Sequence, residues 1–319
     1  MGIGYLYLLL VIFTGLTKGF CGKKTSEYTN EFTNASFANS VRMVLCAIIS
    51  FIAILIFENV SSLNLSLNGF LVSVLSGVLT SIFVVTWLIA VKDSAYMLID
   101  VFLTLFTLVP IILSLIIYNE KIQFIQIIGF IILVISTLIM ASYNNSIKKQ
   151  KLNVKSIIIL LLCGLSNGLN FFCQKYFVNL DGNQSVYAFN FYVYVFSAII
   201  LTLFFIINYY FINNKTTPLN NNKNNNFKEK ISPIKLFKNI YAYIIVMSIC
   251  LFLNSFFSTL ASANLQATLQ YPLQQGLNLT LSLVMSAVLF KEKITLKSII
   301  GILLTFVSLL LINVFPALI

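Results

Sequence analysis

Long apolar runs alternate with short polar connections along almost the whole chain. Each run approaches the roughly 20 residues that a helix needs to cross the hydrocarbon core of a bilayer. Backbone groups in lipid must bond within their own segment, so each run is expected to form a helix. The pattern therefore predicts an all-α, polytopic membrane protein with ten transmembrane helices, at 3–22, 35–57, 69–91, 94–118, 124–143, 156–178, 186–212, 239–262, 266–290 and 296–315.

The chain also repeats part of its own sequence. A Glu-Lys-Ile tripeptide at 120–122, an Ile-Ile-Gly tripeptide shortly after it and a further serine all recur at an offset of 172, starting at 292–294. The glycine-flanked segment 15–19 likewise resembles 164–168. The alternative is that apolar helices look alike through composition alone, but the shared register favours a true repeat.

Five predicted spans pair with five. We therefore predict two five-helix repeats, 1–147 and 148–319, the second containing a mobile Asn- and Lys-rich loop at 213–238. An odd number of spans per repeat places the second copy upside down relative to the first. Inverted repeats are typical of secondary transporters, whose binding site lies near the membrane midplane between the repeats.

Polar residues inside the runs indicate which helix faces point inward, because an unpaired polar group in lipid is costly. Such residues recur at helical spacing in the third, fourth, sixth, eighth and ninth runs. The fifth and tenth runs contain few and are expected to be outer supports. The candidate substrate-binding residues are Asp100, Thr104, Thr107, Asn167, Asn170, Gln274, Asn278, Ser282 and Trp87. The alternative for the Ser and Thr positions is a hydrogen bond to their own helix backbone.

Three charged residues fall within apolar runs. Asp100 is the acidic residue placed well inside a span, where it either binds a cationic group, works as a proton-coupling site, or forms a structural ion pair with Arg42 or Lys18. Arg42 either pairs with Asp100 or holds a substrate anion. Lys18 is expected to extend its ammonium group to the membrane interface.

Prolines mark two of the same runs. Pro110 lies in the fourth run and Pro272, with Gly276, lies in the ninth. Irregular helices at related places in two halves favour a transporter's binding site, whereas the alternative is a simple kink satisfied by neighbouring side chains. We expect both helices to be interrupted.

Composition excludes most other classes of protein. The chain is 59% hydrophobic and 9% charged, against about 25% charged residues in soluble domains, and no polar stretch is long enough for a catalytic domain. It has no histidine, and its five cysteines show no metal-binding spacing. We therefore expect no enzyme activity, no metal and no cofactor. The net charge of +11 comes from lysines in loops, which are topology signals and no indication of nucleic-acid binding.

Taken together, the ten spans and the paired Glu-Lys-Ile turns resemble the drug/metabolite transporter superfamily, most closely its EamA-like ten-helix members. Arg42 and Gly15 fit an early arginine of the second helix and a small residue of the first in that family. The residue before each Glu departs from the family's glycine, being Asn119 and Lys291. The first and sixth runs also lack the acidic residue with which small four-helix relatives couple protons, so the resemblance does not imply that route.

The leading hypothesis is a secondary transporter that moves a small organic metabolite by alternating access. The alternatives are a membrane-embedded enzyme and a channel-like protein. The expected partners are the lipid bilayer and a small-molecule substrate, and the sequence leaves a homodimer open.

Orientation is predicted differently by two arguments. Lysines in or beside odd-numbered loops number 17, against two beside even-numbered loops, which by the positive-inside rule puts both termini outside the cell membrane. The family resemblance implies both termini inside.

Overall fold

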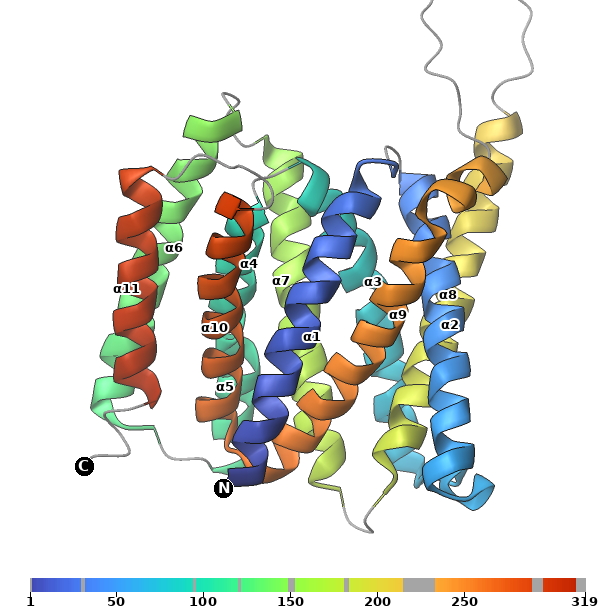
Figure 1. Cartoon of the computed structure of the whole chain (residues 1–319). Coiled ribbons are helices and arrows are strands. Elements are labelled where there is room, and N and C mark those ends of the chain that lie inside the picture. The colour runs from blue at the N-terminus through green and yellow to red at the C-terminus, as the bar shows by residue number, and fades with distance from the viewer. Residues whose placement is uncertain are drawn as a thin grey trace, which may run out of the picture.

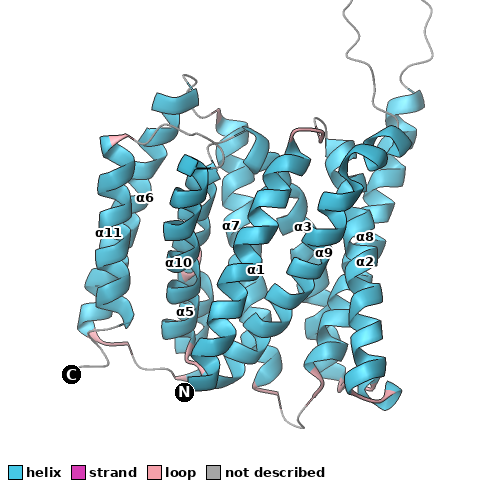
Figure 2. Cartoon of the chain, viewed as in Figure 1, coloured by secondary structure: helices cyan, strands magenta, loops and turns pink. Residues whose placement is uncertain are grey.

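The computed structural model is a bundle of long helices whose axes are roughly parallel or antiparallel, and the described part of the chain begins and ends at one edge of the bundle (Figure 1). It describes residues 2–29, 32–93, 96–119, 122–148, 153–180, 184–214, 233–288 and 295–313, and these form helices and short loops without a strand (Figure 2). Most of the predicted mobile loop and most of both Glu-Lys-Ile turns lie outside the described residues.

The helices follow the predicted runs closely, within the part of the chain described. They are α1 (Gly2–Ser26), α2 (Phe32–Phe57), the short 3₁₀ helix η1 (Val60–Leu63), α3 (Leu67–Asp93), α4 (Tyr96–Leu105), α5 (Leu108–Tyr118), α6 (Phe124–Lys148), α7 (Val154–Val178), α8 (Val186–Asn214), α9 (Pro233–Asn264), α10 (Ala267–Val288) and α11 (Leu296–Asn313). Seven stretches of the described residues are long and apolar enough to cross a membrane, and 124–136 and 299–312 are shorter apolar helices. The all-helical, polytopic prediction is confirmed.

The fourth run is interrupted, as expected, but the break lies before the proline. Pro110 has no N–H, so the Phe106 carbonyl cannot receive the usual bond from four residues later. It accepts instead from the Val109 N–H at 3.1 Å, and the Thr107 N–H donates to the Thr104 carbonyl at 3.2 Å. These tighter turns separate α4 from α5.

Two glycines of α7 make room for this break. A methyl group added at Gly168 would lie 2.5 Å from the Phe106 carbonyl oxygen, and one at Gly164 would lie 2.1 Å from the Phe106 ring. Small residues four apart let membrane helices approach closely. The glycine-flanked segment found in the sequence therefore has a packing role in α7.

The expected interruption of the ninth run is wrong. α10 continues through Pro272, which lies only six residues into the helix. Gly276 is explained by packing: a methyl group there would come within 1.9 Å of Leu309 of α11. Its lack of a side chain serves a close approach between α10 and α11 and does not mark a break.

The contacts between helices occur in matched sets. α1 packs along α9 much as α3 packs along α7, while α2 packs against α8, α6 against α11 and α4 against α10. At the α6–α11 contact, Ser136 and Thr305 share a 2.6 Å hydrogen bond between their hydroxyl groups. A methyl group added at Gly129 would lie 3.0 Å from the Ser308 carbonyl oxygen. The α6–α11 pair forms one edge of the bundle in Figure 1.

The distribution of side chains is that of a lipid-facing protein. Large apolar side chains such as Ile56, Leu138 and Leu303 are exposed on the outside, at 67%, 67% and 59%. Ser, Thr, Asn and Gln side chains are numerous among the buried positions. Exposed apolar surface on this scale requires lipid as its solvent.

Most of the described lysines gather at one end of the bundle. Lys23, Lys92, Lys155 and Lys238 lie at the ends of α1 and α3 and the starts of α7 and α9, which share the edge opposite the chain termini (Figure 1). We call this edge the lysine-rich end and the other the terminal end. Lys175, near the end of α7, lies at the terminal end.

Candidate functional site

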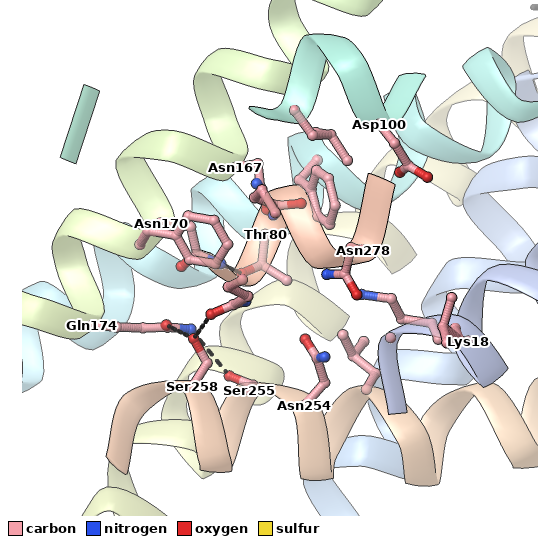
Figure 3. Close-up of a pocket in the computed structure, with 18 of the residues that line it drawn as sticks. Lys18, Thr80, Asp100, Asn167, Asn170, Gln174, Asn254, Ser255, Ser258 and Asn278 are labelled. Atoms are coloured by element: carbon pink, nitrogen blue, oxygen red, sulfur yellow. Dashed lines mark hydrogen bonds between the residues drawn. The ribbon is translucent and has the colours of Figure 1, made fainter. Parts of the chain in front are cut away.

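A cavity of about 80 Å³ lies in the middle of the bundle, between α1, α3 and α4 on one side and α7, α8, α9 and α10 on the other (Figure 3). This is more than one water needs and less than the roughly 300–1,000 Å³ of a pocket for a drug-sized ligand. Six of the nine residues predicted from the sequence line it: Asp100, Asn167, Asn170, Gln274, Asn278 and Ser282.

The other three predicted residues lie outside the cavity wall. The Thr104 hydroxyl donates to the Asp100 carbonyl at 2.7 Å, and the Thr107 hydroxyl donates to the Thr104 carbonyl at 2.7 Å. These are the hydrogen bonds to the helix's own backbone that the alternative interpretation describes, here stabilising the turn before α5. Trp87 packs in the space left by Gly22 of α1, where an added methyl group would lie 2.3 Å from its ring.

Amide side chains form the middle of the cavity wall. The Asn170 side chain accepts a short hydrogen bond from the Ser76 hydroxyl and donates to Thr80 Oγ1 at 3.2 Å. Asn254 of α9 donates to the Val11 carbonyl of α1 at 2.7 Å. These bonds join α3 to α7 and α1 to α9, the two pairs of helices that pack in the same way.

A hydrogen-bond network forms the part of the cavity wall nearer the terminal end, and its Gln174, Ser255 and Ser258 side chains are joined by dashed lines in Figure 3. Ser258 donates to Gln174 Oε1 at 2.9 Å, with Gln274 Oε1 at 3.4 Å. Gln174 Nε2 donates to Ser255 Oγ at 3.5 Å, and Ser255 donates to Asn190 Oδ1 at 2.6 Å. These hydrogen bonds connect α7, α8, α9 and α10 at this side of the cavity.

Tyr271 packs an aromatic ring against this network. Its ring stacks on Phe171, a cavity residue, with centroids 4.8 Å apart. Its hydroxyl donates to the Phe171 carbonyl at 2.7 Å and lies 3.1 Å from the Ser262 hydroxyl. Tyr271 thus holds α10 against both α7 and α9.

Lys175 joins α7 to the end of α9 at the terminal end of the bundle. Its ammonium group donates to the Ser262 carbonyl at 3.1 Å and to the Leu265 carbonyl at 2.9 Å. These are unpaired carbonyls at the C-terminus of α9, where the helix dipole also favours a cation. The side chain is 8% exposed. We call these two bonds the Lys175 latch.

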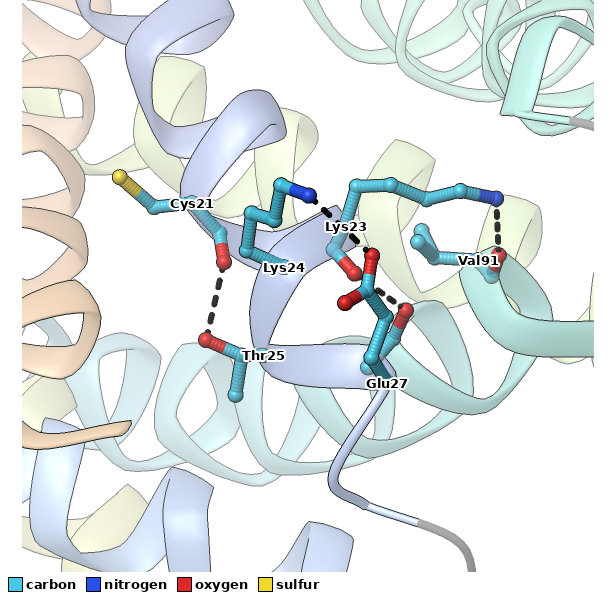
Figure 4. Close-up of polar contacts among 7 residues, drawn as sticks. Cys21, Lys23, Lys24, Thr25, Glu27 and Val91 are labelled. Carbon is cyan, nitrogen blue, oxygen red and sulfur yellow. Dashed lines mark hydrogen bonds and ion pairs between the residues drawn. The ribbon is translucent and has the colours of Figure 1, made fainter. Parts of the chain in front are cut away.

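A related contact lies at the lysine-rich end (Figure 4). The Lys23 ammonium group, near the end of α1, donates to the Val91 carbonyl in the last turn of α3 at 3.1 Å. We call this the Lys23 latch. The neighbouring Lys24–Glu27 pair is long, at 3.5 Å, and both side chains are exposed, so it contributes little.

Three charged side chains lie at the middle depth of the bundle. Asp100 and Lys18 line the cavity, and Arg42 lies close enough for Lys18 to interact with it electrostatically. Neither the Asp100–Arg42 nor the Asp100–Lys18 salt bridge is formed among the described residues. Lys18 points toward Asn278 across the cavity and does not extend to the interface, contrary to expectation (Figure 3).

Several polar atoms of the wall have no protein partner. Ser282 hydrogen-bonds to the Asp100 carboxyl group, but Asp100 Oδ2 has no partner of its own. Asn167 Nδ2 and Asn278 Oδ1 are also buried without a partner. Buried polar groups are normally satisfied, so such atoms indicate where a polar ligand or water binds. Among the described residues no cluster of side chains suits a metal ion.

Sequence reasoning missed part of the wall. Asn254 and Ser258 of α9 were not predicted, although Leu251, Asn254, Ser255 and Ser258 show the i, i+3, i+4, i+7 spacing of one helix face. Tyr194 resembles an interface aromatic in the sequence, yet it is buried beside the cavity and donates to the Leu251 carbonyl at 3.2 Å.

Comparison with known proteins agrees with this architecture. Residues 2–142 and 154–314 each match the model of the EamA-like transporter family. A solved structure titled "Crystal structure of protein" is similar over 96% of this chain and 96% of its own, with a TM-score of 0.64 and 10% sequence identity. That likeness shows a shared fold. No curated protein matches the chain.

Proposed function

This chain belongs to the EamA-like transporter family, and from that premise we propose that it moves a small organic metabolite by alternating access between two inverted five-helix halves. Membership makes it a multi-pass membrane transporter of the drug/metabolite type. The inverted halves, the alternating mechanism and residence in the cell membrane are the steps that we propose. The observation that carries them is a polar cavity between the halves, with the Lys23 latch toward one end of the bundle and the Lys175 latch toward the other.

The helix contacts support two inverted halves. If α1 corresponds to α7, α3 to α9 and α2 to α8, the α1–α9 contact becomes equivalent to α3–α7, while α2–α8 maps onto itself. The contacts α4–α10 and α6–α11 map onto themselves in the same way. In Figure 1 α1 and α7 run in opposite directions, as inversion requires. The halves 1–147 and 148–319 then form the two inverted repeats, and helices move both between and within them.

The two latches support alternating access. Each joins the first helix of a half to the third helix of the same half, and they lie at opposite ends of the bundle. Between them the cavity is walled by three corresponding pairs, α1 and α7, α3 and α9, and α4 and α10, together with α8. Opening one latch while the other stays closed exposes the cavity to one side of the membrane at a time.

Counterflow in proteoliposomes tests this function. Liposomes containing the purified protein are loaded with an unlabelled candidate metabolite and supplied with a trace of the labelled compound outside. A carrier shows saturable uptake and transient accumulation of label, and the labelled compound leaves chemically unchanged. Uptake without saturation and counterflow favours a channel, and a changed product favours an enzyme. Protein-free liposomes are the control.

A further inference from the structure

The membrane-buried centre of the described structure has an unbalanced charge. Lys18, Arg42 and Asp100 are the charged side chains there, two cations and one carboxylate. Lys18 interacts electrostatically with both of the others, so the three belong to one cluster. Lys175 is also buried, but it lies at the terminal end, where two carbonyl oxygens neutralise part of its charge.

Arg42 is the least satisfied member of the cluster. It is 2% exposed, and its Nε and Nη1 are buried without a hydrogen-bond partner. No salt bridge or hydrogen bond to its guanidinium group is formed among the described residues. Its electrostatic neighbours include Tyr194 and Lys18, both of which line the cavity. An unpaired guanidinium at membrane depth is costly, and such groups are kept for function.

The Asp100 carboxylate does not form a salt bridge that neutralises the Arg42 charge. Asp100 bonds to Ser282 on one side and leaves Oδ2 without a partner. The cavity wall therefore offers a donor from Lys18 and a separate acceptor from Asp100, and Arg42, which does not line the cavity, adds a positive charge nearby. With a formal net charge of +1, the cluster is complemented by a ligand with one net negative charge, because charges in a low-dielectric interior are weakly screened.

We propose that the transported substrate is a small organic acid with one net negative charge, whose acid group binds Lys18 within the field of the nearby Arg42 and whose hydrogen-bond donor is held by Asp100. This rests on the proposed function and names the substrate class of the same cavity. The cavity's small volume restricts the ligand to a few heavy atoms in this conformation.

Matched ligands test the charge requirement. The melting temperature of the purified protein is measured with lactate, lactamide and 1-aminopropan-2-ol, and with acetate, acetamide and ethylamine, at millimolar concentrations. Binding to the folded state raises the melting temperature by mass action. We expect stabilisation by at least one acid and by neither its amide nor its amine. No stabilisation by either acid, or equal stabilisation by amides or amines, overturns the proposal.

Variants distinguish an arginine that acts on the ligand from a structural one. Lys18→Gln should weaken binding of the stabilising acid about 10- to 100-fold, the loss expected for a hydrogen bond to a charged group. Arg42→Gln, which removes a positive charge near the acid group, should weaken it about tenfold. Lys155→Gln, at an exposed lysine of the lysine-rich end, should leave binding unchanged. Because the guanidinium is unpaired, Arg42→Gln should keep or raise the melting temperature without ligand. A clear fall there, with acid binding retained, assigns Arg42 a structural role and overturns the proposal.

The outcome separates this inference from the proposed function. An amine or amide that binds and shows counterflow refutes the acid specificity while supporting the carrier. An acid whose binding depends on Lys18 and Arg42 but that shows no counterflow supports the inferred site and counts against transport.

Discussion

Replacing Lys175 with methionine should open the terminal end of the transporter selectively. Methionine keeps much of the side chain's length and apolar stem but removes both hydrogen bonds to the C-terminus of α9. The cavity should then spend more time exposed to the solution at the terminal end. The matched perturbation at the other end is Lys23→Met, which removes the hydrogen bond to the Val91 carbonyl.

The structure sets the size of the two effects. A hydrogen bond to a charged group contributes about 1.5–3 kcal/mol, so two bonds to a buried ammonium group give at least about 3 kcal/mol. At 1.4 kcal/mol per factor of ten, the closed-to-open ratio at the terminal end should fall about 100-fold. The Lys23 side chain is only partly buried, so its bond to the Val91 carbonyl is expected to contribute about 1 kcal/mol, a fivefold change.

Thiol accessibility measures these shifts directly. In a background with all five native cysteines replaced, Ser255→Cys places one thiol at the cavity wall. Its rate of labelling by a small, membrane-impermeant reagent is measured from each side, in right-side-out and inverted vesicles. Lys175→Met should raise the rate from the terminal end, and Lys23→Met should raise it, less strongly, from the lysine-rich end.

Two results would refute the reasoning. If Lys175→Met left the labelling rates from both sides unchanged, the latch would not hold the terminal end closed. If it raised both rates equally, the change would be a general loosening of the bundle and not the opening of one end. An unchanged melting temperature in the Ser255→Cys parent verifies that the probe itself does no damage.

Three further predictions concern the site, the packing and the orientation. Asp100→Asn should lower the rate of counterflow at least tenfold while leaving expression and melting behaviour intact, and full transport by this variant would remove Asp100 from the site. Gly168→Ala should destabilise the protein by about 1–3 kcal/mol in thermal unfolding, because its methyl group would meet the rigid Phe106 carbonyl; Gly2→Ala, with open space around it, should be neutral, and equal effects would contradict the packing argument. By the positive-inside rule, a cysteine replacing Lys155 in the same cysteine-free background should resist an impermeant reagent in intact cells, and rapid labelling would instead place both termini inside.

The helices could be predicted from sequence because the bilayer imposes a simple requirement. A run long enough to cross lipid must satisfy its backbone internally, so the apolar runs and α1 to α11 nearly coincide. The exact position of the helix break near Pro110 could not be predicted from the sequence in the same way. It depends on which carbonyl loses its partner and on the room that Gly164 and Gly168 provide in another helix.

The cavity wall was only partly predictable for a related reason. Polar spacing identifies a buried helix face, but a face has both ligand-facing and backbone-bonded positions. Asp100 and Thr104 share a face, yet Asp100 reaches the cavity while the Thr104 hydroxyl turns back to its own helix. Lys18 shows the converse, because its long chain permits either the interface or the interior, and only the packing of α1 decides between them.

The inequality of the two latches has a kinetic consequence. The Lys175 side chain is buried and the Lys23 side chain is only partly buried, so the two latches differ in strength, and without ligand the open states toward the two solutions differ in free energy. Because of this bias, the unloaded protein mainly populates the state that is open toward the lysine-rich end. Half-saturation and maximal flux must then differ between the two directions. For uncoupled transport, the ratio of maximal flux to half-saturation concentration must nevertheless be the same in both directions. The asymmetry changes how long the protein stays in each state, but it cannot drive a solute up its concentration gradient.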